Sequence, residues 1–343
     1  MSLQVRSVRL GPVSFRARPR TWLVATLAWG IALAGAIAVL FSGSVNMTPE
    51  QFWAALAGVG ERADMLLLWE FRMPRAVTGL VVGACLGAAG CLFQALSRNA
   101  LGSPEIIGLT GGAALGAVAS VIVFRSFGWG TAVGAIIGCL GAALLTWVLS
   151  PRGFGGGNRL ILIGLGVASL IQPVTVLLLT RADSDSATSA RLWLTGTLNA
   201  RNWSHAAVGT VLFVVILPFA LLISRHLDVA APGEDLAAGL GVSRRFTQWT
   251  ATGVGVALTA AAVAVAGPIS FIALAGPHVT RRLLKGPTAP AGVAAGTGAA
   301  LLVAADLVGA NLPGGLQLPV GVMAGLLGGA YLLLLLNGQE RKK

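Results

Sequence analysis

Long uncharged apolar runs recur along the whole chain, and they limit its fold more than any other feature. A helix that crosses the hydrocarbon core of a bilayer needs about 20 consecutive, mostly apolar residues. The sequence predicts ten such spans: Trp22–Phe41, Ala76–Leu96, Ile106–Phe124, Trp129–Leu149, Leu160–Thr180, Ala206–Ser224, Phe246–Ala266, Ile269–Thr280, Ala289–Leu312 and Leu318–Leu336. The eighth is short and contains Gly276 and Pro277. We therefore expect an all-α polytopic membrane protein with about ten transmembrane helices.

The composition indicates that lipid surrounds most of the surface. Only 10% of the residues are charged, 55% are hydrophobic, and the mean hydropathy is +0.82. A water-soluble domain carries roughly 25% charged residues, because its surface must be solvated. This chain has too few charges to cover a surface that faces water.

The basic residues predict the topology of the chain. Its net charge of +12 comes from 24 Lys and Arg against 12 Asp and Glu. They form short clusters between apolar runs and do not alternate with aromatic residues, so we expect no nucleic-acid partner. With ten spans and a cytoplasmic N-terminus, seventeen of the 24 fall in cytoplasmic segments. The positive-inside rule therefore predicts that both termini are cytoplasmic.

These spans define the expected domain organisation. Residues 1–21 form a basic cytoplasmic N-terminus, 22–336 a single transmembrane domain, and 337–343 a cytoplasmic tail. The first apolar run has about 20 residues, whereas the apolar region of a signal peptide has about 7–15. We interpret it as an uncleaved first helix.

Residue patterns for covalent, metal or nucleotide chemistry are lacking in the sequence. Cys85, Cys91 and Cys139 lie within apolar runs at no metal-ligand spacing, and we interpret them as packing residues. No G-x-x-x-x-G-K-[ST] phosphate loop occurs. We expect no catalytic residue, no metal site and no resident cofactor, so any energy from ATP would come from a partner.

Two arginines precede the second span on its outer side, in Arg72-Met73-Pro74-Arg75. Arginine suits bidentate capture of a partner's carboxylates. The alternative is that these residues only anchor the helix at the membrane interface. From the residues alone we prefer anchoring, although the position of these arginines against the positive-inside bias shifts weight toward a binding role.

A second motif lies in the cytoplasmic connection between the sixth and seventh spans. It comprises Gly233, Glu234, Asp235, Leu236, Ala237, Gly239, Leu240, Gly241 and Val242. Its acidic residues would occupy the first turn of a short helix, where negative charge is favourable, and Gly241 suits the left-handed position after the helix end. Its leucines share one face, which suits insertion into a partner's groove. An ordinary amphipathic connector is the alternative.

Three polar residues lie within or beside the spans. Asp306 is an intramembrane carboxylate and therefore a candidate functional residue. We favour bonding to the exposed backbone at residues 313–315 over proton transport. We interpret His278 as a structural residue that bonds backbone, and Glu105 as a carboxylate at the start of the third helix.

Taken together, these motifs resemble the permeases of iron–siderophore, haem and cobalamin ABC importers. The matching stretches are Arg72 through Arg75, Gly83 through Leu101, Gly233 through Val242, Gly267 through Phe271, Pro277-His278, Ala305 through Leu307 and Leu318 through Gly321. The stretch from Gly102 to Gly108 is especially similar to permease subunits for ferric enterobactin, a catecholate siderophore.

The resemblance implies a type II ABC importer permease in a bacterial cytoplasmic (inner) membrane. The expected partners are two ABC ATPases, a periplasmic or lipoprotein substrate-binding protein and a second permease subunit, with a ferric siderophore as cargo. By analogy, Glu234 through Val242 would be the helix that couples to an ATPase, and Arg72 and Arg75 would receive glutamates of the binding protein. Asn99, Leu101, Gly157 and Asn158 match cytoplasmic gate positions, and Arg191 through Leu198 matches an outer-surface helix.

Two departures from the family pattern and several alternatives remain. Ala100 stands where the family usually has proline, and residues 311–317 carry no docking arginine. The second departure favours asymmetric docking in a heterodimer with a paralogous permease over a homodimer. The alternatives are a cobalamin or haem permease, an ion-coupled secondary transporter that uses Asp306, and an intramembrane enzyme.

Overall fold

A computed structural model describes residues 6–10, 13–17, 19–43, 47–150, 157–231, 234–313 and 316–340. The helices are α1 (Pro19–Phe41), α2 (Pro49–Leu56), α3 (Arg62–Leu66), the π-helix η1 (Leu67–Arg72), α4 (Met73–Ser97), α5 (Leu109–Ile122), α6 (Trp129–Leu149), α7 (Asn158–Arg181), α8 (Ser184–Leu194), α9 (Trp203–Ala230), α10 (Glu234–Gly239), α11 (Arg244–Ala266), α12 (Ile272–Leu284), α13 (Ala291–Ala310) and α14 (Val320–Glu340). Strands β1 (Arg6–Leu10) and β2 (Val13–Ala17) form an antiparallel hairpin that the sequence did not predict.

Each predicted span lies on a helix, so the all-α prediction for the transmembrane part is confirmed. Among the described residues, seven helices are long and apolar enough to cross a membrane, and α5 and α14 contribute shorter apolar helices. The eighth span corresponds to α12, which has 13 residues. The third helix, α5, begins at Leu109, three residues later than predicted.

Polar side chains fix where several helices begin. The side chain of Thr48 accepts a hydrogen bond from Gln51 N, and the Gln51 side chain accepts one from Thr48 N, which is a capping box for α2. Asp183 and Asn202 accept similar bonds at the starts of α8 and α9. These bonds satisfy backbone donors that the first helical turn leaves free.

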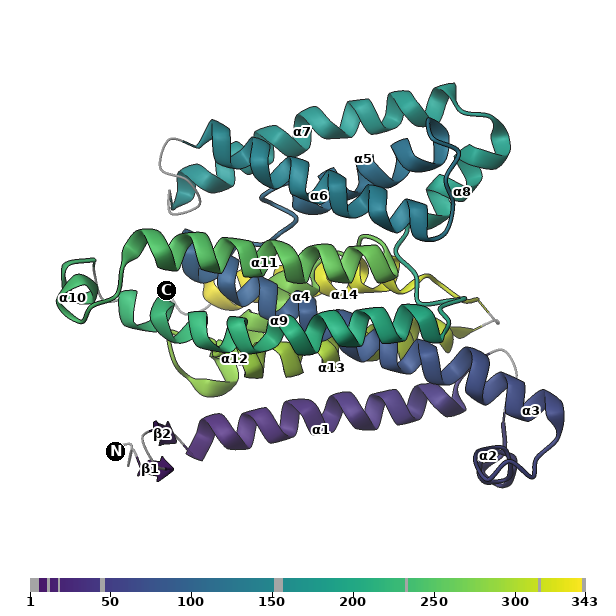
Figure 1. Ribbon diagram of the computed structural model, residues 1–343. Coiled ribbons are helices and arrows are strands. Elements are labelled where there is room, and N and C mark those ends of the chain that lie inside the picture. Colours follow the sequence, from purple (N-terminus) through teal and green to yellow (C-terminus); the bar gives the residue numbers. More distant parts are fainter. Residues whose placement is uncertain are drawn as a thin grey trace.

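Helix α4 lies at the centre of the bundle, among α9, α11, α12 and α13 (Figure 1). Glycines on α4 allow this close packing. A Cβ on Gly87 would lie 2.1 Å from the Ala294 oxygen, and one on Gly90 would lie 1.7 Å from the Ala273 oxygen. Small residues permit such backbone approach between membrane helices. These glycines therefore serve the packing of α4 against α12 and α13.

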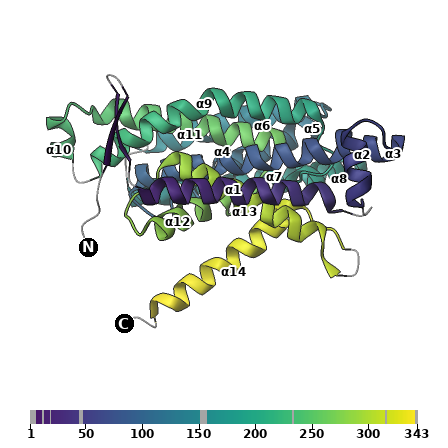
Figure 2. The same ribbon diagram turned by 90° about the horizontal axis from the view of Figure 1, so that it is seen from below.

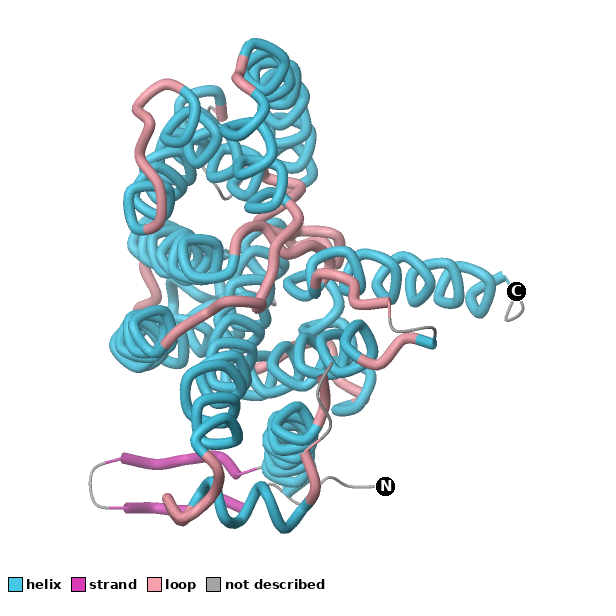
Figure 3. The backbone as a smooth tube through the Cα atoms, turned by 90° about the vertical axis from the view of Figure 1, so that its right-hand side faces the viewer, coloured by secondary structure: helices cyan, strands magenta, loops and turns pink. Residues whose placement is uncertain are grey.

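The outer helices expose their apolar side chains. Large hydrophobic residues are exposed along α1, α6, α7 and α9, where a soluble protein would place polar groups. Helix α14 extends away from the other helices (Figures 2 and 3). These exposed faces suit contact with lipid or with another membrane subunit.

The two ends of the bundle carry different segments. The β1–β2 hairpin, α10 and the C-terminus lie at one end, and α2, α3 and α8 lie at the other (Figures 1 and 2). The β1–β2 hairpin and the end of α14 therefore lie toward the same end of the bundle. We name the two ends after the roles predicted from the sequence: the end with α10 is the coupling end, and the end with α2, α3 and α8 is the docking end.

Candidate functional site

Arg75 and Asp306 form a bidentate ion pair near the docking end. Arg75 Nε donates to Asp306 Oδ2 at 2.9 Å, and Arg75 Nη2 donates to Asp306 Oδ1 at 2.8 Å. Their side chains are 20% and 4% exposed. We expected Asp306 to bond the backbone at residues 313–315. That expectation is corrected, because both carboxylate oxygens of Asp306 bond Arg75 of α4. Residues 314–315 lie outside the described part.

Arg72 is also engaged inside the chain. Arg72 is only 5% exposed, and its Nη1 donates a hydrogen bond to the carbonyl of Leu40 at the end of α1. The two predicted docking arginines thus link η1 to α1 and α4 to α13 in this structure. A docking role requires a partner carboxylate to share Arg75 with Asp306, or Arg72 to leave its present contact.

The predicted coupling segment forms a compact exposed helix. The leucines Leu236 and Leu240 are 63% and 71% exposed, whereas Ala237 is buried against the bundle. Gly241 has φ +77°, and Val242 N donates to Ala237 O at 2.9 Å, which closes the helix with a Schellman-type bond. The left-handed Gly241 is confirmed. Gly233 and the side chains of Glu234 and Asp235 lie outside the described part.

Three of the predicted gate residues, Asn99, Leu101 and Gly157, lie in turns next to helix ends. Asn99 Oδ1 accepts from Leu101 N at 2.8 Å, which forms an Asx turn after the left-handed Arg98. Leu101 is half exposed. Gly157, just before α7, lies beside the end of α4, because a Cβ on it would be 3.8 Å from Ser97 O. Gly157 therefore lies near the turn that follows α4; Asn158 is the first residue of α7, and its side chain is not described.

Glu105 was predicted to stabilise the start of the third helix, α5, but its carboxylate bonds the backbone just before α12. It lies four residues before α5, and Oε1 accepts from Phe271 N at 2.7 Å, just before α12. Phe271 itself has φ +67°, an uncommon conformation for a bulky residue. The carboxylate therefore stabilises the broken connection between α11 and α12.

His278 joins two helices. Its Nδ1 and the Tyr331 hydroxyl share a 2.9 Å hydrogen bond, and the rings are in edge contact with centroids 5.9 Å apart. The structural interpretation of His278 is retained, but its bonding partner is a side chain of α14 and not the backbone. The pairing was missed because nothing in the sequence marks α12 and α14 as neighbours.

Tyr331→Phe should lower stability by about 1 kcal/mol, because it removes this hydrogen bond and keeps the ring. Thermal unfolding of the purified protein measures the loss. The same substitution in a His278→Phe background should cost clearly less, and additive losses would show that the two side chains do not interact.

The three cysteines are free and buried, as expected of packing residues. The thiol of Cys91 donates to the carbonyl of Ala289 at 2.7 Å.

The predicted outer-surface helix is α8, which spans Ser184–Leu194 and ends before the left-handed Gly196. It begins seven residues earlier than predicted.

Comparisons with known proteins agree with this arrangement. A model of the FecCD transport family matches residues 31–337. The chain is 40% identical to the ferric enterobactin transport system permease protein FepG of Escherichia coli, over 89% of this chain and 92% of the relative. It is 32% identical to the iron(3+)-hydroxamate import system permease protein FhuG of Bacillus subtilis, over 86% and 90%.

A solved structure shows the same fold. It is a metal-chelate type ABC transporter in an inward-facing conformation, and it matches with a TM-score of 0.80 and 26% sequence identity over 93% of this chain and 99% of that chain. The family match covers all but the start of the predicted transmembrane region. The chain therefore belongs to the FecCD transport family.

Proposed function

We propose that this chain is the permease subunit of a binding-protein-dependent ABC importer for ferric siderophores. The relatives named for ferric enterobactin and ferric hydroxamate support iron–siderophore cargo. The observation that carries the coupling mechanism is the exposed, capped helix α10. Without a phosphate loop of its own, the chain needs ATPase partners, and α10 offers them an apolar contact.

In this proposal, α10 fits a groove on an ATPase subunit. Its exposed leucines enter the groove, and the Schellman closure keeps the helix end fixed so that motion of the ATPase reaches α9 and α11. The coupling end is then cytoplasmic, and both termini lie in the cytoplasm. Asn99, Leu101, Gly157 and Asn158 lie at this side and form the cytoplasmic gate.

The paired substitution Leu236→Ser and Leu240→Ser should lower cargo-stimulated ATP hydrolysis at least about tenfold, because it removes the apolar anchors of the contact. Hydrolysis is measured in proteoliposomes that contain the chain, its partner permease, the ATPase and the loaded binding protein.

Ile137→Ser is the matched control. Ile137 is a similarly exposed apolar residue, 64% exposed, but it lies in the middle of α6, away from both ends of the bundle. Its substitution should leave hydrolysis unchanged. If the leucine variant hydrolysed ATP and imported cargo as the parent chain does, α10 would not be the coupling element.

The cargo we favour is a catecholate siderophore of the enterobactin kind. The 40% identity to FepG and the stretch from Gly102 to Gly108 support it. Hydrolysis should respond most strongly to a binding protein loaded with a ferric catecholate. A response only to ferric hydroxamate, ferric citrate, haem or cobalamin would reassign the cargo.

The docking end is proposed to receive the substrate-binding protein. A glutamate of that protein would bind Arg75, which also remains paired with Asp306, and would attract Arg72 toward the surface. Opposite charges that meet at an interface favour association. Weaker association at higher salt, measured by binding of the partner to the reconstituted transporter, is the expected sign of this contact.

The assembly is proposed to contain two permeases, with a paralogue as the second subunit. The lack of a charged residue between Asn311 and Gln317 supports asymmetric docking. Expression of this chain with only the ATPase and binding protein should give no uptake, whereas uptake from that set would show a homodimer.

A further inference from the structure

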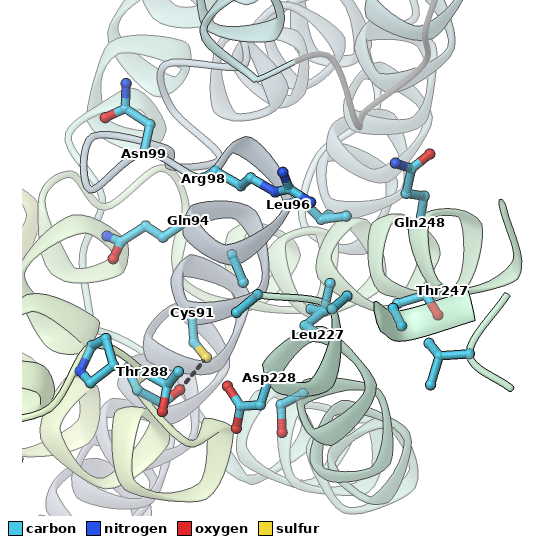
Figure 4. Close-up of a pocket in the computed structure, with 18 of the residues that line it drawn as sticks. Cys91, Gln94, Leu96, Arg98, Asn99, Leu227, Asp228, Thr247, Gln248 and Thr288 are labelled. Carbon is cyan, nitrogen blue, oxygen red and sulfur yellow. Dashed lines mark hydrogen bonds between the residues drawn. The ribbon is translucent and has the colours of Figure 1, made fainter. Parts of the chain in front are cut away.

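At the coupling end, the charged side chains beside the proposed gate already interact within the chain. Arg98 and Asp228 line a cavity of about 430 Å³ together with the gate residue Asn99 (Figure 4). Both charged residues have interaction partners. We therefore assign this cavity to the gate and turn to the opposite end of the bundle, where one arginine is placed differently.

That residue is Arg201, in the connection that joins α8 to the start of α9 at the docking end (Figure 1). Its side chain is partly buried, and Nε donates to the carbonyl oxygen of Thr197 at 3.1 Å. Within the described residues, its two terminal Nη groups have no hydrogen-bond partner, and they stay open to the surface. Arg201 is therefore half fixed and half free.

The charge of Arg201 is not balanced by a carboxylate of the described chain. Arg75 pairs with Asp306, whereas Arg201 forms no ion pair with any described residue. Burial lowers the pKa of Arg201, and no described carboxylate offsets that effect. The undescribed residues that connect helices at this end, 44–46 and 314–315, contain no Asp or Glu. A partly buried cation without a counter-ion costs free energy, which an anion from another molecule recovers.

The backbone holds this arginine in a fixed position. Ala200, directly before it, has φ +57°, a conformation that residues with a side chain rarely adopt. Thr197 N donates to Ala266 O at 2.9 Å, and Leu198 is buried in the core. Strained residues persist where the surrounding structure holds them, and they concentrate at binding sites. The loop therefore presents Arg201 in a preformed orientation.

The surroundings of Arg201 suit a protein partner. Trp203 Nε1 donates to the carbonyl of Trp69 at 2.7 Å, so the loop lies beside η1, which carries Arg72. Trp69 and Trp203 are 40% and 39% exposed. Arginine and tryptophan are among the residue types that contribute most to binding at protein interfaces. The planar guanidinium group also matches a carboxylate in two parallel hydrogen bonds.

We propose that Arg201 binds a carboxylate of the substrate-binding protein, on the surface that it forms with Trp69 and Trp203. This contact rests on the importer function proposed above. It adds to the two predicted docking arginines, which are bonded inside the chain to Leu40 and Asp306. Because its Nη groups are free, Arg201 receives the acidic side chain without breaking an internal bond.

Association with the binding protein tests this contact. The assembled transporter is placed in nanodiscs of phosphatidylcholine, and the loaded binding protein that stimulates its ATP hydrolysis is added. Biolayer interferometry gives Kd and the dissociation rate. Arg201→Gln should weaken association at least about tenfold, mainly through faster dissociation, because it removes charge-assisted hydrogen bonds. Arg245→Gln removes an exposed arginine from the start of α11, at the other end, and it should bind as the parent chain does.

A double-mutant cycle separates this contact from a structural role of Arg201. Each surface Asp or Glu of the binding protein is replaced singly by its amide and measured against the parent chain and against Arg201→Gln. One of these substitutions should weaken association with the parent chain and have little further effect on the variant. Arg201→Lys, which keeps the charge without the planar fork, should lose less than Arg201→Gln and serves for the same cycle.

Equal association of Arg201→Gln and the parent chain would overturn the proposal, as would losses that are additive with those of every acidic residue. A loss that appears only in nanodiscs containing phosphatidylglycerol would assign Arg201 to a lipid headgroup and would also overturn it. None of these results affects the importer function, which fails separately if no binding protein stimulates ATP hydrolysis.

Discussion

Arg75→Ala should destabilise the protein by about 3–5 kcal/mol, because it leaves a buried carboxylate without its countercharge. Asp306 is 3% exposed, and both of its oxygens accept hydrogen bonds from Arg75. Within a membrane the carboxylate has little water to replace those donors. Denaturant or thermal unfolding of the purified protein in detergent measures the loss.

Two comparisons separate this effect from a general loss of charge. Arg125→Ala breaks an exposed ion pair with Asp183, whose partners are 2.9 Å apart, and it should leave stability nearly unchanged. Replacing both Arg75 and Asp306 with leucine should recover most of the loss, since apolar replacement of a whole buried pair is often neutral. A double variant no more stable than Arg75→Ala would contradict the pairing.

Gly90→Val should prevent correct packing of the central helix, at a cost of at least about 3 kcal/mol. A Cβ at position 90 would lie 1.7 Å from the carbonyl oxygen of Ala273, a backbone atom that can move only if α12 moves. We expect little monodisperse protein after solubilisation, measured by size-exclusion chromatography, and a lower unfolding temperature for the remainder.

Gly141→Val tests the same substitution where space is free. A Cβ at Gly141 on α6 would have no atom of another element within 4 Å. This variant should behave like the parent chain. Equal losses at both positions would mean that backbone preference, and not close approach of α4 to α12, sets the cost.

The sequence predicted the spans well, because each depends on local composition alone. A run without charges must avoid water wherever it lies, and its length sets whether it crosses the bilayer. Composition does not show which of the apolar runs form the central helices of the bundle. Helix α4 and helix α7 have similar hydropathy, 2.0 and 2.2, yet the window on α4 is 89% buried and that on α7 is 17% buried. The glycines of α4 suit its central position, but α5 and α13 also contain several, so glycine content does not identify the central helix.

Pairings between distant residues were not predictable in the same way. Arg75 and Asp306 are 231 positions apart, and Glu105 and Phe271 are 166 apart. Each pair depends on which helices are neighbours, which hydropathy does not specify. Opposite charges near the outer ends of two spans could have indicated the first pair. No comparable signal existed for the second, because its donor is a backbone N–H.

The coupling segment was predictable because its signals are local. Gly241 favoured a left-handed residue, and the spacing of Leu236 and Leu240 placed both on one face; φ +77° and the high exposure of the leucines match these expectations. Its role as a contact for an ATPase depends on another molecule. That role is therefore a proposal that only an assembled transporter can test.

The most direct test is uptake of a ferric catecholate siderophore into proteoliposomes that contain this chain, its partner permease and the ATPase, with the loaded binding protein outside. The proposal predicts uptake that requires ATP inside, on the side of α10, and that continues when the proton gradient is dissipated. Uptake without ATP that stops when the gradient is removed would contradict it and would favour an ion-coupled transporter.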